Sequence, residues 1–263
     1  MIRFHGAWKY SLGVLLAVGL ASVPTLAAGD ILGFEPQYWD QSMAGTVRVD
    51  GDTLPGTEID LGDDLGLEEK DRLPAGRLWI HWLKRNYLIF TAFHSERNGE
   101  KVLASPLAFN GQDFPAGEQV KSRVETDLKS LLYGYNFLDL RLVKVGFRIG
   151  ANRLGFDAKM DSASSPVEAS SSESVTFPVA GLGFAFEPIP LLRFTGEISG
   201  IGGSIGSNDV TFYDARIQTE VYWAHFFGMI AGYRRMKTEV DLEDFGAADV
   251  TQKGPYAGFV FRF

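Results

Sequence analysis

Hydrophobic and polar residues alternate with a period of two along most of the chain after residue 28. In the segment 123–132, charged side chains occupy the odd positions from 123 to 129, and apolar or small side chains occupy most of the even ones. The segments 142–152, 192–199 and 213–223 repeat this arrangement. Successive side chains of a strand point to opposite faces, whereas a helix would spread these charges around its circumference. The pattern therefore predicts strands.

The connections between these strands fall into two classes. Short connections are expected at 83–86, 137–140, 187–190 and 223–226. Long polar connections are expected at about 50–74, 96–120, 157–173, 201–209 and 241–252. Because short and long connections alternate, the chain is predicted to be all-β, an antiparallel up-and-down transmembrane β-barrel of about ten strands, with eight or twelve as alternatives. All long loops would lie at one end.

The first 28 residues differ from the rest of the chain. Arg3 and Lys9 precede an apolar run at 12–23, and small residues follow at Ala27 and Ala28. This order is typical of a secretory signal peptide, cleaved after either alanine. An uncleaved anchor is the less favoured alternative, because a spanning helix needs about 20 apolar residues. We expect two parts, a signal peptide at 1–28 and a barrel domain at 29–263.

Charge and cysteine content narrow the function classes. The formal charge is -8, and loss of Arg3 and Lys9 with the signal peptide changes it to -10. A surface this acidic argues against nucleic acid as a partner. The chain has no cysteine, so it offers neither a disulfide nor a cysteine for lipid attachment.

Aromatic residues gather near the expected short turns. The cluster comprises Trp79, Trp82, Tyr87, Tyr133, Tyr135, Phe137, Phe184, Phe186, Tyr222, Trp223, Phe226 and Phe227. An aromatic girdle at one membrane interface has this placement. A soluble β-sandwich is the alternative, and it would spread its aromatic residues along the strands. The clustering favours the membrane barrel.

The chain resembles the bacterial outer-membrane β-barrels in its signal peptide, its alternating strands, its two classes of loop and its C-terminal "GFVFRF", and the resemblance covers the whole mature part. The resemblance implies that the last strand is read by the barrel-assembly machinery, through Tyr256, Phe259, Phe261 and Phe263. The period of two predicts that Phe259, Phe261 and Phe263 face lipid and that the alternate residues, Tyr256, Gly258, Val260 and Arg262, face the lumen. The chain is also similar to a poorly characterised group of such barrels, through "IDLGDDLGL" (59–67), "FNG" (109–111) and "YDA" (213–215). That group implies a fold and a location but no activity.

If the apolar faces of the strands contact lipid, the charged faces line the lumen. The residues expected there are Arg48, Arg77, His81, Arg123, Glu125, Asp127, Lys129, Lys144, Arg148, Arg193, Glu197, Asp214, Arg216, Glu220, Arg234 and Arg262. Opposite charges on neighbouring strands can pair, and inward glycines such as Gly183 leave room for long side chains. Side chains fill eight-stranded barrels, whereas barrels of about 16 strands form open channels. We expect a mostly filled lumen and a structural or surface-interaction role; a narrow channel for ions or small solutes is the alternative.

A membrane hydrolase with a site at the rim is a second alternative. His94 and Ser95 are adjacent, so a regular strand would point them to opposite faces and prevent the hydrogen bond that nucleophilic catalysis needs. We therefore predict no catalytic residue.

The acidic stretch 58–71 contains seven carboxylates, but its spacing does not match an EF-hand. A solvated loop is the favoured reading, and divalent cations bridging it to lipopolysaccharide is the weaker one. We predict neither a metal nor another cofactor. The expected partners are outer-membrane lipid and lipopolysaccharide and the assembly machinery, with the protein itself a monomer.

Overall fold

The computed structural model describes residues 31–51, 56–163, 167–205, 208–242 and 246–263. The predicted signal peptide at 1–28 lies outside the described residues and stays a prediction. Among the described residues, no helix is long and apolar enough to cross a bilayer.

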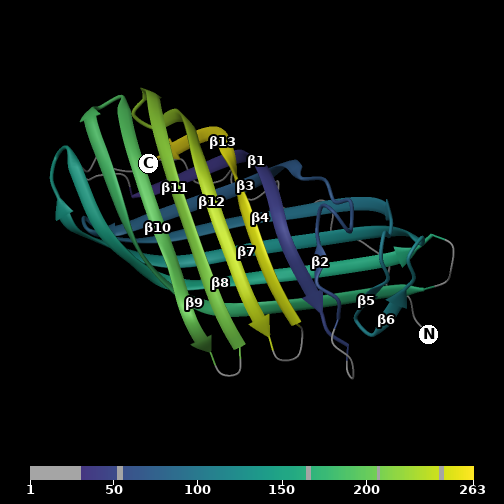
Figure 1. Cartoon of the computed structure of the whole chain (residues 1–263). Coiled ribbons are helices and arrows are strands. Elements are labelled where there is room, and N and C mark those ends of the chain that lie inside the picture. The colour runs from purple at the N-terminus through teal and green to yellow at the C-terminus, as the bar shows by residue number, and fades with distance from the viewer. Residues whose placement is uncertain (1–30, 52–55, 164–166, 206–207, 243–245) are drawn as a thin grey trace, which may run out of the picture.

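Ten long strands form the wall of a barrel (Figure 1). They are β1 (Leu32–Val49), β3 (Lys70–Leu83), β4 (Asn86–Val102), β7 (Gln119–Asp139), β8 (Val143–Ser162), β9 (Glu168–Ile189), β10 (Leu192–Ile205), β11 (Asn208–Ala224), β12 (Phe227–Leu242) and β13 (Gly246–Arg262). Three short strands lie in the connections, β2 (Ile59–Asp60), β5 (Leu107–Phe109) and β6 (Gln112–Phe114).

Each long strand pairs antiparallel with the next one along the chain, and β13 pairs with β1. This last pairing closes the sheet, so every long strand has two neighbours and the wall has no free edge. At the seam, the backbone N–H of Phe263 donates to the carbonyl of Leu32 at 2.8 Å, and the N–H of Leu32 donates to the carbonyl of Phe263 at 3.0 Å. The predicted antiparallel barrel of about ten strands is confirmed.

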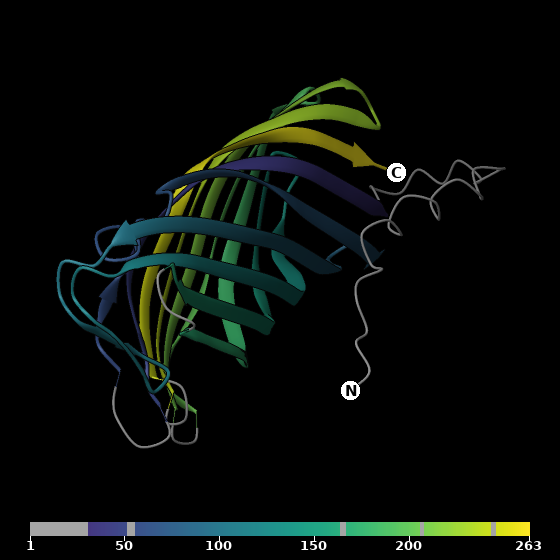
Figure 2. The same ribbon diagram turned by 90° about the vertical axis from the view of Figure 1, so that its right-hand side faces the viewer.

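The short turns lie close to their predicted places, but the strands are longer than the alternation suggested. The connections β3–β4, β9–β10 and β11–β12 each contain two residues, and β7–β8 contains three, shifted to 140–142. The long connections expected at 157–173, 201–209 and 241–252 are mostly strand. Strands of 14 to 22 residues exceed the roughly ten needed to cross a bilayer. The barrel wall is therefore longer than a bilayer crossing requires, and Figure 2 shows its long strands from the side.

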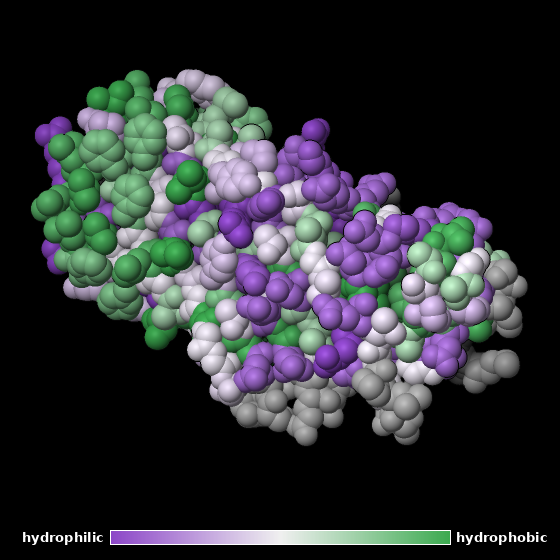
Figure 3. Space-filling view, in the orientation of Figure 1, coloured by the Kyte–Doolittle hydropathy of each residue, from purple (hydrophilic) through white to green (hydrophobic). Residues whose placement is uncertain are grey.

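The outer face of the barrel changes character along its length. Near the short turns, every long strand exposes apolar side chains, which we call the apolar belt: Phe34, Tyr38, Ile80, Leu88, Phe90, Leu131, Phe147, Ile149, Leu182, Phe184, Ile198, Ile217, Val221, Met229, Tyr233 and Phe259. Beyond the belt, the same strand faces carry charges, as His94 and Glu96 do above Phe90. Figure 3 shows apolar surface gathered at the end where the C-terminus lies, whereas the rest of the visible face is a mixture in which polar residues predominate. The belt marks the part in contact with lipid.

The inner face also changes along the length of the barrel. Within the belt, the lumen holds charged and polar side chains beside buried apolar ones such as Ile89 and Leu132, whereas a second, hydrophobic core lies inside the far end of the barrel. Val47, Val124 and Met160 point inward there and pack against loop residues such as Leu61 and Phe109. Short strands β2, β5 and β6 lie at this end, away from the C-terminus (Figure 1). Outside the membrane the barrel is thus built like a soluble protein, polar outside and apolar inside.

Candidate functional site

The centre of the lumen is an ion-pair cluster around one carboxylate. Glu197 on β10 lies 2.5 Å from the guanidinium of Arg77 on β3, through Oε1, and 2.8 Å from that of Arg148 on β8, through Oε2. Both arginine side chains are at most 10% exposed. Because β3 lies five strands from β10 in the ring, the pair between Arg77 and Glu197 connects opposite walls through the lumen.

A second group of polar side chains continues the network. Glu35 on β1 accepts a hydrogen bond from Arg216 on β11 at 3.1 Å and another from the amide of Gln218 at 3.0 Å. The same amide donates to Glu220, which also accepts from the hydroxyl of Tyr222. All five side chains are buried. Charges of both signs are therefore paired across the seam region, as buried charges must be.

Further ion pairs extend the network in both directions. Arg193 lies 3.4 Å from Glu187 and 3.9 Å from Glu220, and Lys144 lies 3.8 Å from Glu187.

Arg234 contacts both oxygens of Asp214, at 2.8 and 2.7 Å. Its guanidinium lies 5.1 Å from the ring centroid of Trp39 and 5.3 Å from that of Phe93. Nearer the short turns, the guanidinium of Arg262 lies 3.6 Å from the centroid of the Tyr222 ring. Stacking and pairing together fix these arginines in the lumen.

Glycine on an intervening strand makes room for this network. Gly183 on β9 pairs with both Gly146 on β8 and Glu197 on β10, and a Cβ built on it would lie 2.4 Å from a guanidinium nitrogen of Arg148. Arg148 therefore reaches Glu197 over a residue without a side chain, and Gly183 leaves room for a long side chain as predicted. A cavity of about 30 Å³ remains between Arg148, Asn152, Arg216 and Arg234, which suits a water molecule rather than a solute.

Of the sixteen residues expected in the lumen, the structure places nine in the network just described: Lys144, Arg148, Arg193, Glu197, Asp214, Arg216, Glu220, Arg234 and Arg262. Arg77 and His81 also have the inward orientation expected of them, Arg77 on Glu197 and His81 with its ring centroid 5.0 Å from that of Tyr87.

The orientation predicted for Arg123, Glu125, Asp127 and Lys129 is wrong. These residues lie on the outer face of β7, on the same side as Leu131, while Val124, Thr126 and Leu128 are buried inside. Arg48 also lies on the outer face of β1. The prediction applied the lipid rule, apolar outside and charged inside, to parts of the strands that stand in water, where the rule reverses.

Several members of the network were not predicted. Glu35 and Glu187 lie in the lumen although no charge pattern marked them, and Gln218 lies there on the charged face of the segment 213–223 although it is itself uncharged. The inward-facing Trp79, Tyr87 and Tyr222 were wrongly expected in the girdle. Each of these three residues is adjacent in sequence to an exposed apolar or aromatic residue, and this alternation could have predicted that they face the lumen. Trp82, Trp223 and Phe226 do form an exposed ring at the short turns.

Two loops close the far end of the barrel. In the first, Ile59, Leu61, Leu65 and Leu67 alternate with carboxylates, and these four are buried. In the second, β5 and β6 form a hairpin around Asn110 and Gly111, both with positive φ, the conformation that an Asn-Gly turn favours. Phe109 and Phe114 of this hairpin are buried. We refer to these two loops, 56–69 and 103–118, as the cap.

Arg97 connects the cap to the barrel wall by hydrogen bonds, at a level beyond the apolar belt. Its guanidinium donates to the backbone carbonyl of Glu68 in the cap, and to both the backbone and side-chain oxygens of Gln41 on β1, at 3.1 and 2.9 Å. Burial lowers the pKa of Arg97, opposed by the nearby carboxylates of Asp71, Glu68 and Glu69. Three carbonyl-type acceptors compensate part of the cost of burying this charge.

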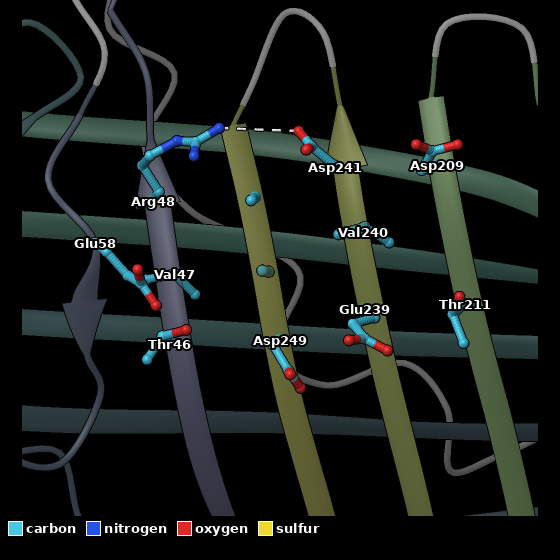
Figure 4. A pocket seen from close by; sticks show the side chains of 12 residues that line it. Thr46, Val47, Arg48, Glu58, Asp209, Thr211, Glu239, Val240, Asp241 and Asp249 are labelled. Carbon is cyan, nitrogen blue, oxygen red and sulfur yellow. Dashed lines mark ion pairs between the residues drawn. The ribbon is translucent and has the colours of Figure 1, made fainter. Parts of the chain in front are cut away.

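The outer wall carries a groove of about 350 Å³ above the belt, across β1, β13, β12 and β11. Its acidic lining comprises Glu58, Asp209, Glu239, Asp241 and Asp249 (Figure 4). Arg48 is the basic residue of the lining; it lies 3.1 Å from Asp50 and 3.9 Å from Asp241. The groove is a concave, negatively charged surface in the solvent-exposed part of the barrel.

The residues weighed for catalysis do not meet. His94 is exposed, and its Nδ1 lies 3.1 Å from Oδ1 of Asp127. Ser95 is buried on the opposite face, as the period of two predicted. The acidic stretch 58–71 exposes most of its carboxylates, and within the described parts of the chain no group of three histidine, aspartate or glutamate side chains could hold a metal ion.

The C-terminal strand has the predicted orientation. Tyr256 and Val260 are buried in the lumen, and Phe259 and Phe263 are about half exposed on the outside. Phe263 stacks on Phe226, with ring centroids 6.5 Å apart. Its recognition by an assembly machinery stays a prediction.

No family model matches the chain, and no curated protein matches it. Solved structures do. The outer membrane protease OmpT from Escherichia coli superposes with a TM-score of 0.57 at 9% identity, over 89% of this chain and 97% of that one. The transport unit of the autotransporter AIDA-I from Escherichia coli gives 0.46 at 8% identity, over 94% and 95%. Ail, the attachment invasion locus protein of Yersinia pestis, gives 0.38 at 14%, over 88% and 99%.

The similarity to OmpT concerns the fold alone at this identity. With the closed ten-stranded sheet and the apolar belt, it identifies the architecture as that of the bacterial outer-membrane β-barrels. That fold hosts enzymes and non-enzymatic proteins alike, so the role of this chain follows from its own side chains.

Proposed function

We propose that this protein is a closed, non-conducting outer-membrane barrel without enzymatic activity, whose role lies in its water-exposed end. The observation that carries the proposal is the ion-paired network around Glu197, which fills the lumen at the level of the belt. An ion that crosses here would have to break the pairs of Glu197 with Arg77 and Arg148, because the cavity beside them holds about one water molecule. The cap adds a second closure at the far end.

A surface role fits the long wall beyond the belt. Strands that merely anchor a barrel need about ten residues, whereas β7 has 21 and β9 has 22. The additional length builds a rigid projection with its own hydrophobic core and the acidic groove on its side. Such a platform suits contact with other molecules at the cell surface better than passage of solutes.

Planar-bilayer recording tests the closed lumen directly. The refolded chain is expected to insert without stable conductance steps. A double variant Arg77→Ser with Arg148→Ser, which removes both partners of Glu197, is the positive control for opening the lumen. Reproducible single-channel steps from the unmodified protein would replace the proposal with the narrow channel.

A lipid and peptide hydrolysis assay tests the absence of enzymatic activity. The unmodified chain and a His94→Ala variant are both expected to show background rates. A rate above background that His94→Ala abolishes would support the hydrolase instead.

A further inference from the structure

Four basic residues lie on the outer face just above the apolar belt, as two cross-strand pairs of like charge. Lys129 on β7 is directly opposite Arg153 on β8, and Arg235 on β12 is directly opposite Lys253 on β13. All four side chains are exposed. Like charges directly opposite each other destabilise a sheet, so these pairs carry a cost that the fold does not require.

The pairs sit at the edge of the lipid-contacting surface. Two residues nearer the short turns on the same faces are Leu131 and Tyr233, both members of the belt. The charges therefore lie at the height where lipid head groups begin, since head groups flank the hydrocarbon core.

Within the described portion of the chain, these four bases form no ion pair, unlike Lys159 and Lys237 farther from the belt. Arg153 donates to the hydroxyl of Ser174 at 3.2 Å, and the guanidinium of Arg235 lies 6.0 Å from the centroid of the Tyr213 ring.

Farther out on the same wall, Lys159 pairs with Asp161 and Glu168, and Lys237 pairs with Glu239 and Asp249. Their hydrogen bonds to these carboxylates raise the pKa values of both lysines. Lys159 and Lys237, which lie above the membrane edge, thus have acidic partners, whereas the four bases at the edge have none among the described residues.

We propose that each basic pair binds a phosphate group of a phosphorylated glycolipid in the outer leaflet. Cross-strand Cβ atoms are about 5 Å apart, so two cations on adjacent strands can share the oxygens of one phosphate, and the acyl chains then lie along the belt below. In the ring order β1-β3-β4-β7-β8-β9-β10-β11-β12-β13, the pairs β7/β8 and β12/β13 are five strands apart. The two sites therefore face opposite sides and bind separate lipid molecules.

Native mass spectrometry of the refolded full chain tests this proposal, which rests on the outer-membrane placement proposed above but not on the closed lumen. The probe is diphosphorylated lipid A, compared with its dephosphorylated form. The parent protein is expected to retain two lipid A molecules. Each double variant, Lys129→Gln with Arg153→Gln or Arg235→Gln with Lys253→Gln, should lose one, with affinity at that site reduced about tenfold. The dephosphorylated lipid should bind weakly to all of them.

Lys159→Gln with Lys237→Gln is the matched control, because it removes the same charge from bases that already have partners. Equal retention by the parent and the pair variants, an equal loss in the control, or equal binding of dephosphorylated lipid would each overturn the proposal. Competition by millimolar inorganic phosphate would indicate a site for free phosphate and would also overturn it.

Thermal stability supplies a second readout that a loss of folding cannot imitate. Without lipid A, removing the like-charge repulsion should leave the melting temperature of each pair variant unchanged or higher. With lipid A, the parent should gain stability and the variant carrying both double substitutions should not. A variant that melts lower without lipid and gains as much as the parent with it would contradict the assignment. Failure of the protein to fractionate with outer membranes would instead count against the proposed location.

Discussion

Arg148 and Glu197 form a 2.8 Å ion pair across the intervening strand β9. The second oxygen of Glu197 is bound by Arg77 from the far side of the lumen. One carboxylate thus compensates two buried cations at the level of the membrane. Its removal should have a larger effect than the removal of any single carboxylate on the outer wall.

Glu197→Gln should destabilise the barrel by about 3–5 kcal/mol, because breaking a buried ion pair leaves charges without compensation. The matched control is Glu125→Gln on the outer face, where the cost should stay within about 1 kcal/mol. Urea unfolding in detergent micelles, followed by the gel shift between folded and boiled protein, measures both. Equal midpoints for the two variants would show that the lumen network does not stabilise the barrel.

Gly183→Val should displace Arg148 from Glu197. The added side chain would begin 2.4 Å from the guanidinium, so the pair must separate or the wall must shift, at a cost of about 1–3 kcal/mol. Gly202→Ala on β10 is the control, since a Cβ there meets its nearest atom, on Thr211, at 3.9 Å. Unfolding midpoints compare the two, and a fully stable Gly183→Val protein would contradict the packing described here.

Cysteine labelling can test the orientation of β7 on whole cells. A membrane-impermeant maleimide should react rapidly with Glu125→Cys, which faces water above the belt, and slowly with Thr126→Cys, which is 7% exposed inside the barrel. The chain contains no other cysteine, so no background substitution is needed. The reverse order of reactivity would show that the charged face of β7 lines the lumen, as the sequence alone had predicted for this strand.

Phe114→Ala should loosen the cap without opening the lumen. A buried phenylalanine contributes about 3–5 kcal/mol, but the loss is local, so the expected result is faster proteolysis within 103–118. Bilayer conductance should stay absent because the network around Glu197 is untouched. Gln112→Ala, an exposed change in the same hairpin, is the control. Conductance steps that appear only in Phe114→Ala would show that the cap is the main barrier.

Deletion of Phe263 should impair assembly into the outer membrane, because this residue closes the seam with Leu32 and ends the strand that resembles an assembly signal. Phe226→Ala removes the stacking partner of Phe263 but leaves the terminus intact. If the terminal residue itself is recognised, the deletion should reduce the folded protein in membrane fractions much more than Phe226→Ala does. Equal amounts of folded protein in the membrane fractions of the two variants would show that Phe263 acts only through packing.

The sequence by itself determined the fold class and much of the lumen. A period of two needs only local geometry, so the strands, the short turns and the inward positions of Arg148, Glu197 and Arg216 could be predicted from residue order. The orientation of the last strand followed for the same reason, with Phe259 and Phe263 outside.

Only the tertiary structure decided where the membrane ends along each strand. Alternation reports that Arg123 and Val124 face opposite sides, but which side is inside depends on whether lipid or water surrounds that height of the barrel. That height is set by the register of all ten strands around the closed ring. Partners such as Glu197 and Arg77, 120 residues apart, are likewise brought together only by closure, which no local pattern records.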